Sequence, residues 1–369
     1  AIGYNALAAQ NVDGDVLNTA VGYFAGKSIT TGNVNTLVGG LSGQLLTEGN
    51  SNVAIGYGTL SAETLGDRNV AIGVNALNAQ ANTSDTDVYN VAIGYAAGTS
   101  VSTGNQNTII GGLAGDALTT GANNVALGYQ SLTAATTSSF NVSMGSLSMS
   151  NNILAARNVG IGYNTLNQLN TGSATDTYNT AVGFSAGAAI TTGVQNTIVG
   201  GLAGGAITEG IQNTIVGGAA GDAITTGSNN LALGYNSLSA TTVGNDNIAI
   251  GKDALEVNVN GSASIAIGSL ALEDQLPAGT GNVYNIAIGH HAGKDVTTGI
   301  RNTLIGGLAG DSVTTGSENT TLGFQSGAAL TTGGKNVAIG GDALLGNLLG
   351  SRNVAICLLY TSPSPRDPI

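Results

Sequence analysis

Carboxylates and tyrosines gather in three short segments of a chain in which only 8% of the residues are charged. The segments lie at residues 81–88, 170–177 and 273–283, and a Tyr-Asn pair follows each of them closely. Carboxylate oxygens accept hydrogen bonds and phenol groups both donate and accept them, so such a set suits a polar ligand. The candidate ligand-contact residues are therefore Asp85, Asp87, Tyr89, Asp176, Tyr178, Glu273, Asp274 and Tyr284.

Two glycine-rich patterns suggest other chemistry without meeting its requirements. Gly22–Ser28 reads GYFAGKS, with one residue fewer between its glycines than a phosphate-binding loop needs. GGLAGD, at Gly111–Asp116 and Gly306–Asp311, is similar to calcium-binding glycine-aspartate repeats, but most equivalent positions lack the aspartate. We expect no nucleotide, no metal and no cofactor.

His290 and His291 are the only histidines. Adjacent strand residues point to opposite faces, so we do not expect one chain to bring both rings to one ion. Histidines related by a three-fold axis could do so, but the pair occupies positions held elsewhere by aromatic residues such as Tyr23 and Phe24. Substitution for an aromatic residue is therefore the simpler interpretation.

No residue constellation predicts an enzyme. The sequence offers no Ser/His/Asp or Cys/His set and no carboxylate pair in register. Thr-Thr-Gly recurs, as at Thr30–Gly32, and would stack one threonine per repeat into an exposed ladder. An ice-binding solenoid is a minor alternative for that ladder, and the β-propensity of threonine also explains it.

A repeat that fills nearly the whole chain positions all these residues. Its core reads NVAIG at Asn52–Gly56, and its final glycine recurs at a common step of about 17 residues, as from Gly56 to Gly73. Sixteen steps have this length, the first is slightly longer, and three carry a four-residue insertion, as from Gly73 to Gly94. Such a length suits one coil of a solenoid with two short strands and two corners. We predict an all-β fold, a parallel β-solenoid (β-roll) of about 20 coils of about 17 residues over residues 1–356.

Each repeat also predicts its corners and its interior. The glycine after the strand marks a turn or a close backbone approach, and the preceding asparagines should stack into an amide ladder. Some repeats carry a large aliphatic residue four positions after that glycine, as at Leu60. The others carry Gly there and an aliphatic residue three positions later, as at Ile29. These look like two ways of filling one core layer at constant volume.

Both faces of each strand are apolar, so one should fill the coil and the other should meet a second sheet or chain. We expect the middle residue, Ala54 in NVAIG, on the outward face and Val53 and Ile55 inside. Large middle residues such as Leu37 coincide with Gly after the motif glycine, whereas Ala often coincides with Tyr, as at Tyr57. This exchange of bulk predicts that the outward face is packed.

The insertions in the three longer repeats lie in the segments 81–88, 170–177 and 273–283, which we expect to be loops. Loops on a rigid scaffold are the usual place for binding residues. The alternative is that they are tolerated insertions without a partner.

Composition and charge limit the classes of binding partner that we expect. The net charge is -12, which disfavours nucleic acid and anionic membranes, and no long apolar run predicts membrane insertion. The tail Cys357–Ile369 does not fit the repeat, and its CLLYTSPSPRD resembles a translated sequencing-library adapter. We therefore expect residues 357–369 to be an artefact and residues 1–356 to be an array cut at both ends.

The repeats NVAIG, NTAVG and NIAIG, with Gly-x-x-Asn corners, resemble the head repeats of YadA-type trimeric autotransporter adhesins and the repeat arrays of phage tail fibres. The resemblance spans about residues 1–356 and implies a homotrimer of left-handed β-rolls. It further implies an extracellular place, on a bacterial outer membrane or a phage virion tail, and attachment to a host receptor, glycan or matrix protein. The alternative function is a structural spacer without its own ligand.

Overall fold

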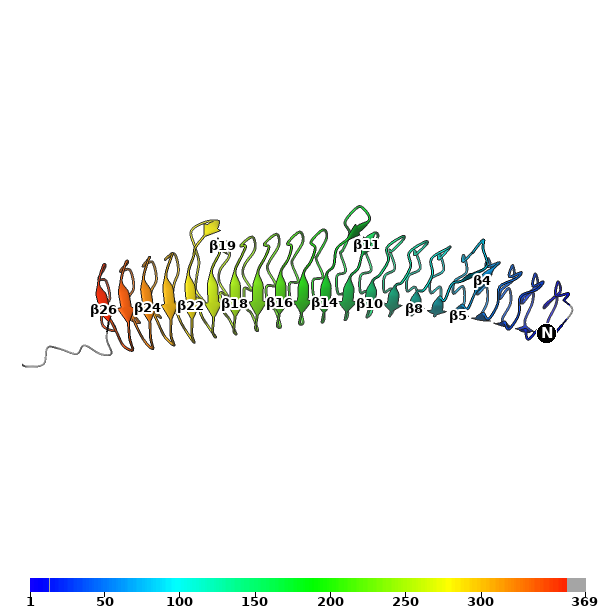
Figure 1. The fold of residues 1–369 in the computed structure, drawn as a ribbon, viewed down its shortest axis with the longest axis horizontal. Coiled ribbons are helices and arrows are strands. Elements are labelled where there is room, and N and C mark those ends of the chain that lie inside the picture. The colour runs from blue at the N-terminus through cyan, green and yellow to red at the C-terminus, as the bar shows by residue number, and fades with distance from the viewer. Residues whose placement is uncertain (13, 357–369) are drawn as a thin grey trace, which may run out of the picture. The chain divides into compact units, whose positions relative to one another are not determined.

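The computed structural model describes residues 1–12 and 14–356, so the expected artefactual tail lies outside the described residues. The chain divides into two units, Ala1–Thr192 and Gly193–Ile369. Within each unit the chain winds in successive coils, and every coil adds a short strand beside the strand of the coil before it (Figure 1). The residues that the structure describes contain no helix, hence none that could span a membrane.

Three-residue strands of the N-terminal unit pair in parallel with the strand of the next coil. Partners lie one repeat apart, as in Val53↔Val70, or one repeat plus an insertion apart, as in Val70↔Val91. These strands are β1 (Thr19–Val21), β2 (Thr36–Val38), β3 (Val53–Ile55), β5 (Val70–Ile72), β7 (Val91–Ile93), β8 (Thr108–Ile110), β9 (Val125–Leu127), β10 (Val142–Met144), β12 (Val159–Ile161) and β14 (Thr180–Val182).

Strands of the C-terminal unit follow the same rule, with Ile248↔Ile265 at the common spacing and Ile265↔Ile286 across an insertion. They are β15 (Thr197–Val199), β16 (Thr214–Val216), β17 (Leu231–Leu233), β18 (Ile248–Ile250), β20 (Ile265–Ile267), β22 (Ile286–Ile288), β23 (Thr303–Ile305), β24 (Thr320–Leu322), β25 (Val337–Ile339) and β26 (Val354–Ile356). The prediction of an all-β parallel β-solenoid with about 20 coils is confirmed.

Each insertion forms a two-stranded parallel sheet of its own with the coil before it. Pairing joins Asp67 to Asp87, Ala156 to Asp176 and Ser262 to Asn282. The strands are β4 (Gly66–Asp67) with β6 (Thr86–Asp87), β11 (Ala155–Ala156) with β13 (Thr175–Asp176), and β19 (Gly261–Ser262) with β21 (Gly281–Asn282).

Both corner devices predicted from the sequence are present. Gly56 has φ of +138°, and a Cβ there would lie 2.7 Å from the carbonyl oxygen of Gly73 in the next coil, so glycine is required. The asparagines form the predicted amide ladder. The backbone N–H of Asn52 donates to Oδ1 of Asn35 at 2.9 Å, and its Nδ2 donates to the Gly66 carbonyl at 2.9 Å. These bonds satisfy buried polar groups at each corner.

The middle residue of each strand faces the coil interior, so the expectation that it points outward was wrong. Ala54 and Leu37 are fully buried, whereas Val53 is half-buried and Ile55 is 38% exposed. Alternation along a strand separates two faces but does not say which one is inside. The inner position accepts Ala and Leu alike, so side-chain size does not mark the interior face.

Large interior residues compete for one layer, as predicted. Leu60 and Ile29 are both fully buried. A Cβ at Gly26 would lie 2.8 Å from Cδ1 of Leu37 and 3.0 Å from Cδ1 of Ile29, so these side chains occupy the space that a leucine fills in the other coil type. Close packing of this kind tolerates few added atoms.

The exchange involving tyrosine has a different cause from the one expected. Tyr57 lies outside the coil, and a Cβ at Gly40 of the preceding coil would lie 3.4 Å from its Cδ2. The ring therefore leans on a glycine of the neighbouring coil, while Leu37 lies inside. The two positions do not share a face.

Candidate functional site

The insertions beside β11 and β19 project from the coils on the side away from the three-residue strands of their own unit, and β4 lies on the same side at the first insertion (Figure 1). From Asn35 onward, the residue before each ladder asparagine adopts a left-handed conformation, with φ of +60° at Arg68 and +56° at Tyr89. This conformation is uncommon for residues other than glycine, and it is imposed here by the repeated corner. It places large side chains in an exposed column beside the insertions.

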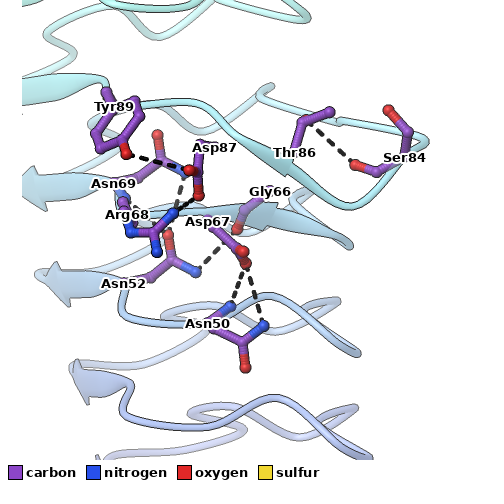
Figure 2. A network of polar contacts seen from close by, with 10 residues as sticks. All are labelled: Asn50, Asn52, Gly66, Asp67, Arg68, Asn69, Ser84, Thr86, Asp87 and Tyr89. Carbon is purple, nitrogen blue, oxygen red and sulfur yellow. Dashed lines mark hydrogen bonds and ion pairs between the residues drawn. The ribbon is translucent and has the colours of Figure 1, made fainter.

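At the first insertion, Arg68, Asp87 and Tyr89 form one cluster (Figure 2). Arg68 Nη1 forms an ion pair with Oδ1 of Asp87, and the Tyr89 hydroxyl donates to Oδ2 of Asp87 at 3.1 Å. The guanidinium carbon lies 5.7 Å from the centre of the Tyr89 ring. All three side chains are exposed or half-exposed, so the cluster can meet a ligand.

Further carboxylates surround this cluster. Asp67 Oδ1 accepts a hydrogen bond from the backbone N–H of Asn50 (Figure 2). Burial raises the pKa of Asp67, and the charge of the exposed Asp85 raises it further. The first insertion therefore presents an acidic surface around one arginine.

A buried carboxylate fixes the base of the first insertion. Glu63 is fully buried, and its Oε1 accepts from the backbone N–H groups of Thr64 and Gly66, both at 2.8 Å. Its Oε2 accepts from Gln80 Nε2 and Asn82 Nδ2, also at 2.8 Å. These bonds tie strand β4 to the inserted coil.

The second insertion repeats the cluster with Arg157, Asp176 and Tyr178. Arg157 Nε donates to Oδ2 of Asp176 at 2.8 Å, and the Tyr178 hydroxyl donates to the same oxygen at 3.3 Å. The guanidinium carbon lies 4.8 Å from the centre of the Phe140 ring and 5.9 Å from that of Tyr178. An arginine between two aromatic rings is held by cation–π attraction as well as by its ion pair.

The third insertion separates its candidate residues. Tyr284 accepts a hydrogen bond from Asn282 Nδ2 at 2.7 Å, so an amide stands where the other insertions have aspartate. Glu273 and Asp274 belong instead to a cluster around Lys294, whose Nζ lies 3.6 Å from Glu273 Oε2 and 4.0 Å from Asp274 Oδ2. A hydrogen bond from Lys294 to Asp295 raises the pKa of the Lys294 ammonium.

Sequence reasoning missed the arginines and Phe140. Arg68 and Arg157 both directly precede a ladder asparagine, one coil before an insertion. That shared position was a usable signal. Their partners could not be read from it, because the short sheets at the insertions set Asp67 opposite Asp87, a spacing that matches neither repeat length.

The histidine pair does not behave as strand residues. His290 and His291 lie in the turn after β22 and stack with ring centres 4.1 Å apart, so the reasoning that placed them on opposite faces was wrong. Tyr23 and Phe24 have the same separation, in keeping with the interpretation that the histidines replace aromatic residues. Within residues 1–12 and 14–356, no group of three or more His, Cys, Asp or Glu side chains is arranged to hold a metal ion.

In the Thr-Thr-Gly repeats, the first threonine of a pair belongs to a ladder whose hydroxyls bond to the next coil. Thr30 Oγ1 donates to the Thr47 carbonyl at 3.2 Å, and Thr225 Oγ1 donates to the Thr242 carbonyl at 3.1 Å. These hydroxyls therefore link successive coils.

The residues and contacts above define a β-solenoid that carries polar insertion clusters and an exposed aliphatic strand face. No protein-family model and no curated protein matches this sequence.

Proposed function

We propose that this chain is a segment of an extracellular or virion-surface fibre, in which three copies pack through their strand faces and the insertions contact a host receptor, glycan or matrix protein. The observation that carries the proposal is the outward face of the three-residue strands. Its side chains are almost all Val, Ile, Leu or Thr, and many remain well exposed.

Exposure on this face is continuous within each unit. Ile55 and Ile161 are each 38% exposed, and Leu322 is 45% exposed. Soluble monomers rarely expose long contiguous apolar patches, so such a face favours an interface. The same residue types recur in every coil, so a second copy offers a surface of matching shape and polarity. The number of three copies follows the resemblance to trimeric adhesins.

Polar character concentrates on the insertion side of the coil. The Arg–Asp–Tyr clusters of the first two insertions remain exposed while the strand face would be covered. This arrangement supports attachment through the insertions of an assembled fibre.

Light scattering on the full chain tests the assembly. We expect a trimer, and we expect Ile72→Lys together with Ile93→Lys to weaken it, because both side chains lie on the outward strand face. The exposed Thr103→Lys is the matched control and should leave the trimer intact. A stable monomer of the unaltered chain would contradict the proposal.

A structural spacer is the second candidate, favoured by the stretch from β14 to β19, which has no insertion and whose threonine hydroxyls bond to neighbouring coils. Binding of the fluorescently labelled full chain to a panel of cultured cells separates the two functions. Saturable binding that falls when Arg68 and Arg157 are both changed to Ala supports attachment. Trimers that bind no cell type support the spacer.

A further inference from the structure

The second insertion borders an open pocket of about 650 Å³, within the size range of small-molecule sites. Phe140, Leu154, Arg157, Thr175 and Asp176 are among its lining residues. The lining thus combines an aromatic ring, an ion pair, small apolar groups and hydroxyls. All of it belongs to the N-terminal unit.

We propose that this pocket binds a neutral hexopyranose unit. The inference rests on the proposed attachment function and names the class of ligand that the second insertion takes. A pyranose has an apolar face of C–H groups and a rim of hydroxyls, and the pocket offers a surface for each.

Phe140 supplies the apolar surface. Its side chain is 50% exposed, although Arg157 packs against the ring. Partial burial by the guanidinium fixes the orientation of the ring, since cation–π contacts hold both groups. Covering a fixed and exposed aromatic ring with the C–H face of a sugar stabilises the complex.

Asp176 and Arg157 supply the polar surface. Both hydrogen bonds to Asp176, from Arg157 Nε and from the Tyr178 hydroxyl, end on Oδ2. The second carboxylate oxygen can therefore accept from a sugar hydroxyl, and the terminal guanidinium nitrogens can donate to another. Such charge-assisted hydrogen bonds are stronger than neutral ones.

Charge favours a neutral sugar over an acidic one. The arginine and the aspartate cancel within the pocket, and the whole chain carries a net charge of -12. An acidic sugar would meet Asp176 without a free cation to offset it.

The first insertion provides a natural contrast. It keeps the Arg–Asp–Tyr cluster, but Ser51 stands where the second insertion has Phe140, and Asp67 and Asp85 stand where it has Ala156 and Ala174. We therefore expect hexose binding at the second insertion and not at the first.

The test is saturation-transfer NMR and calorimetry on the full chain with the methyl glycosides of glucose, galactose and mannose. Methyl N-acetylneuraminate glycoside serves as the acidic probe. We expect at least one neutral glycoside to bind. Phe140→Ser should weaken that binding at least tenfold, and Asp176→Asn should weaken it severalfold. The matched control Arg301→Ala, at an exposed arginine that also precedes a ladder asparagine, should change it less than twofold.

Soluble polysaccharides of the same hexose show whether the pocket takes an internal unit or a terminal residue of a sugar chain. If it takes an internal unit, a polysaccharide whose chain ends are masked still binds. Absence of binding by all neutral glycosides, equal binding by Phe140→Ser, or preference for the acidic probe overturns the sugar proposal. Failure here while the full chain still forms trimers that bind cells leaves the attachment function standing. If the unaltered trimer binds no cell type, in contrast, the attachment function itself is contradicted.

Discussion

The first and second insertions of the N-terminal unit hold the same Arg–Asp–Tyr cluster in different surroundings. At the first insertion the cluster is ringed by Asp67 and Asp85, and burial raises the pKa of Asp67. At the second, alanines replace both aspartates and Phe140 packs on the arginine. One backbone device thus presents an acidic surface in one place and an aromatic, electrically balanced surface in another. The difference indicates that the cluster holds the insertion in place, while other residues of the insertion and of the coils before it set the chemistry of the surface.

The bases of the two insertions differ even more than their surfaces. Glu63 closes the first with backbone and side-chain bonds, whereas Asn152 closes the second by accepting from the Ala155 N–H at 2.9 Å and donating to the Ala155 carbonyl at 3.0 Å. Changing Glu63 to Ala leaves several buried donors without an acceptor, which should cost about 3–5 kcal/mol locally. Hydrogen–deuterium exchange of peptides spanning 60–90 should show this loss of protection.

Asn152→Ala is the counterpart at the second insertion. It removes fewer bonds, so we expect a local loss of about 1–2 kcal/mol. Exchange measured over residues 150–180 should rise less than exchange over 60–90 in Glu63→Ala. Equal effects would mean that the buried carboxylate of Glu63 stabilises its insertion no more than the amide of Asn152 does.

The bases and clusters of the insertions show which features of the structure could be predicted from the sequence. Spacing located the insertions, the stacked glycines such as Gly56, the asparagine ladder and the buried Leu60 and Ile29, because each depends on position within the repeat. It could not assign Ala54 to the interior, since both strand faces are apolar and alternation has no direction. Nor could it pair Arg68 with Asp87, because the short sheet at the insertion follows a spacing of its own.

The third insertion offers a way to rebuild the cluster. Ala263 and Asn282 occupy the positions of the arginine and the aspartate. Ala263→Arg with Asn282→Asp should introduce the ion pair of the other two insertions and stabilise the third by about 0.2–1 kcal/mol, as expected for an exposed pair. A double-mutant cycle followed by hydrogen exchange measures the coupling, and high salt should reduce it. Zero coupling would show that the cluster needs more than these side chains.

The smallest expected difference between the first two insertions is their response to pH. Burial, then the charge of Asp85, raises the pKa of Asp67, while its hydrogen bonds from Asn50 and the charge of Arg68 oppose the shift. A carboxyl whose pKa is higher in the folded state binds its proton more tightly there than in the unfolded chain. Ionised Asp67 therefore costs stability above its folded pKa, and this cost is relieved as pH falls through that pKa toward the ordinary value of 3.8.

Exchange of the Gly66 and Asp67 amides, corrected for the intrinsic rate, should accordingly slow slightly as pH falls within that window. Asp67→Asn should remove the dependence, and the matched segment at Ala155–Ala156 should lack it, because an alanine occupies the equivalent position. The same slowing at Ala155–Ala156 would assign it to the shared Arg–Asp–Tyr cluster. The contrast between the two insertions would then lie in their aromatic and acidic surfaces and not in their stability.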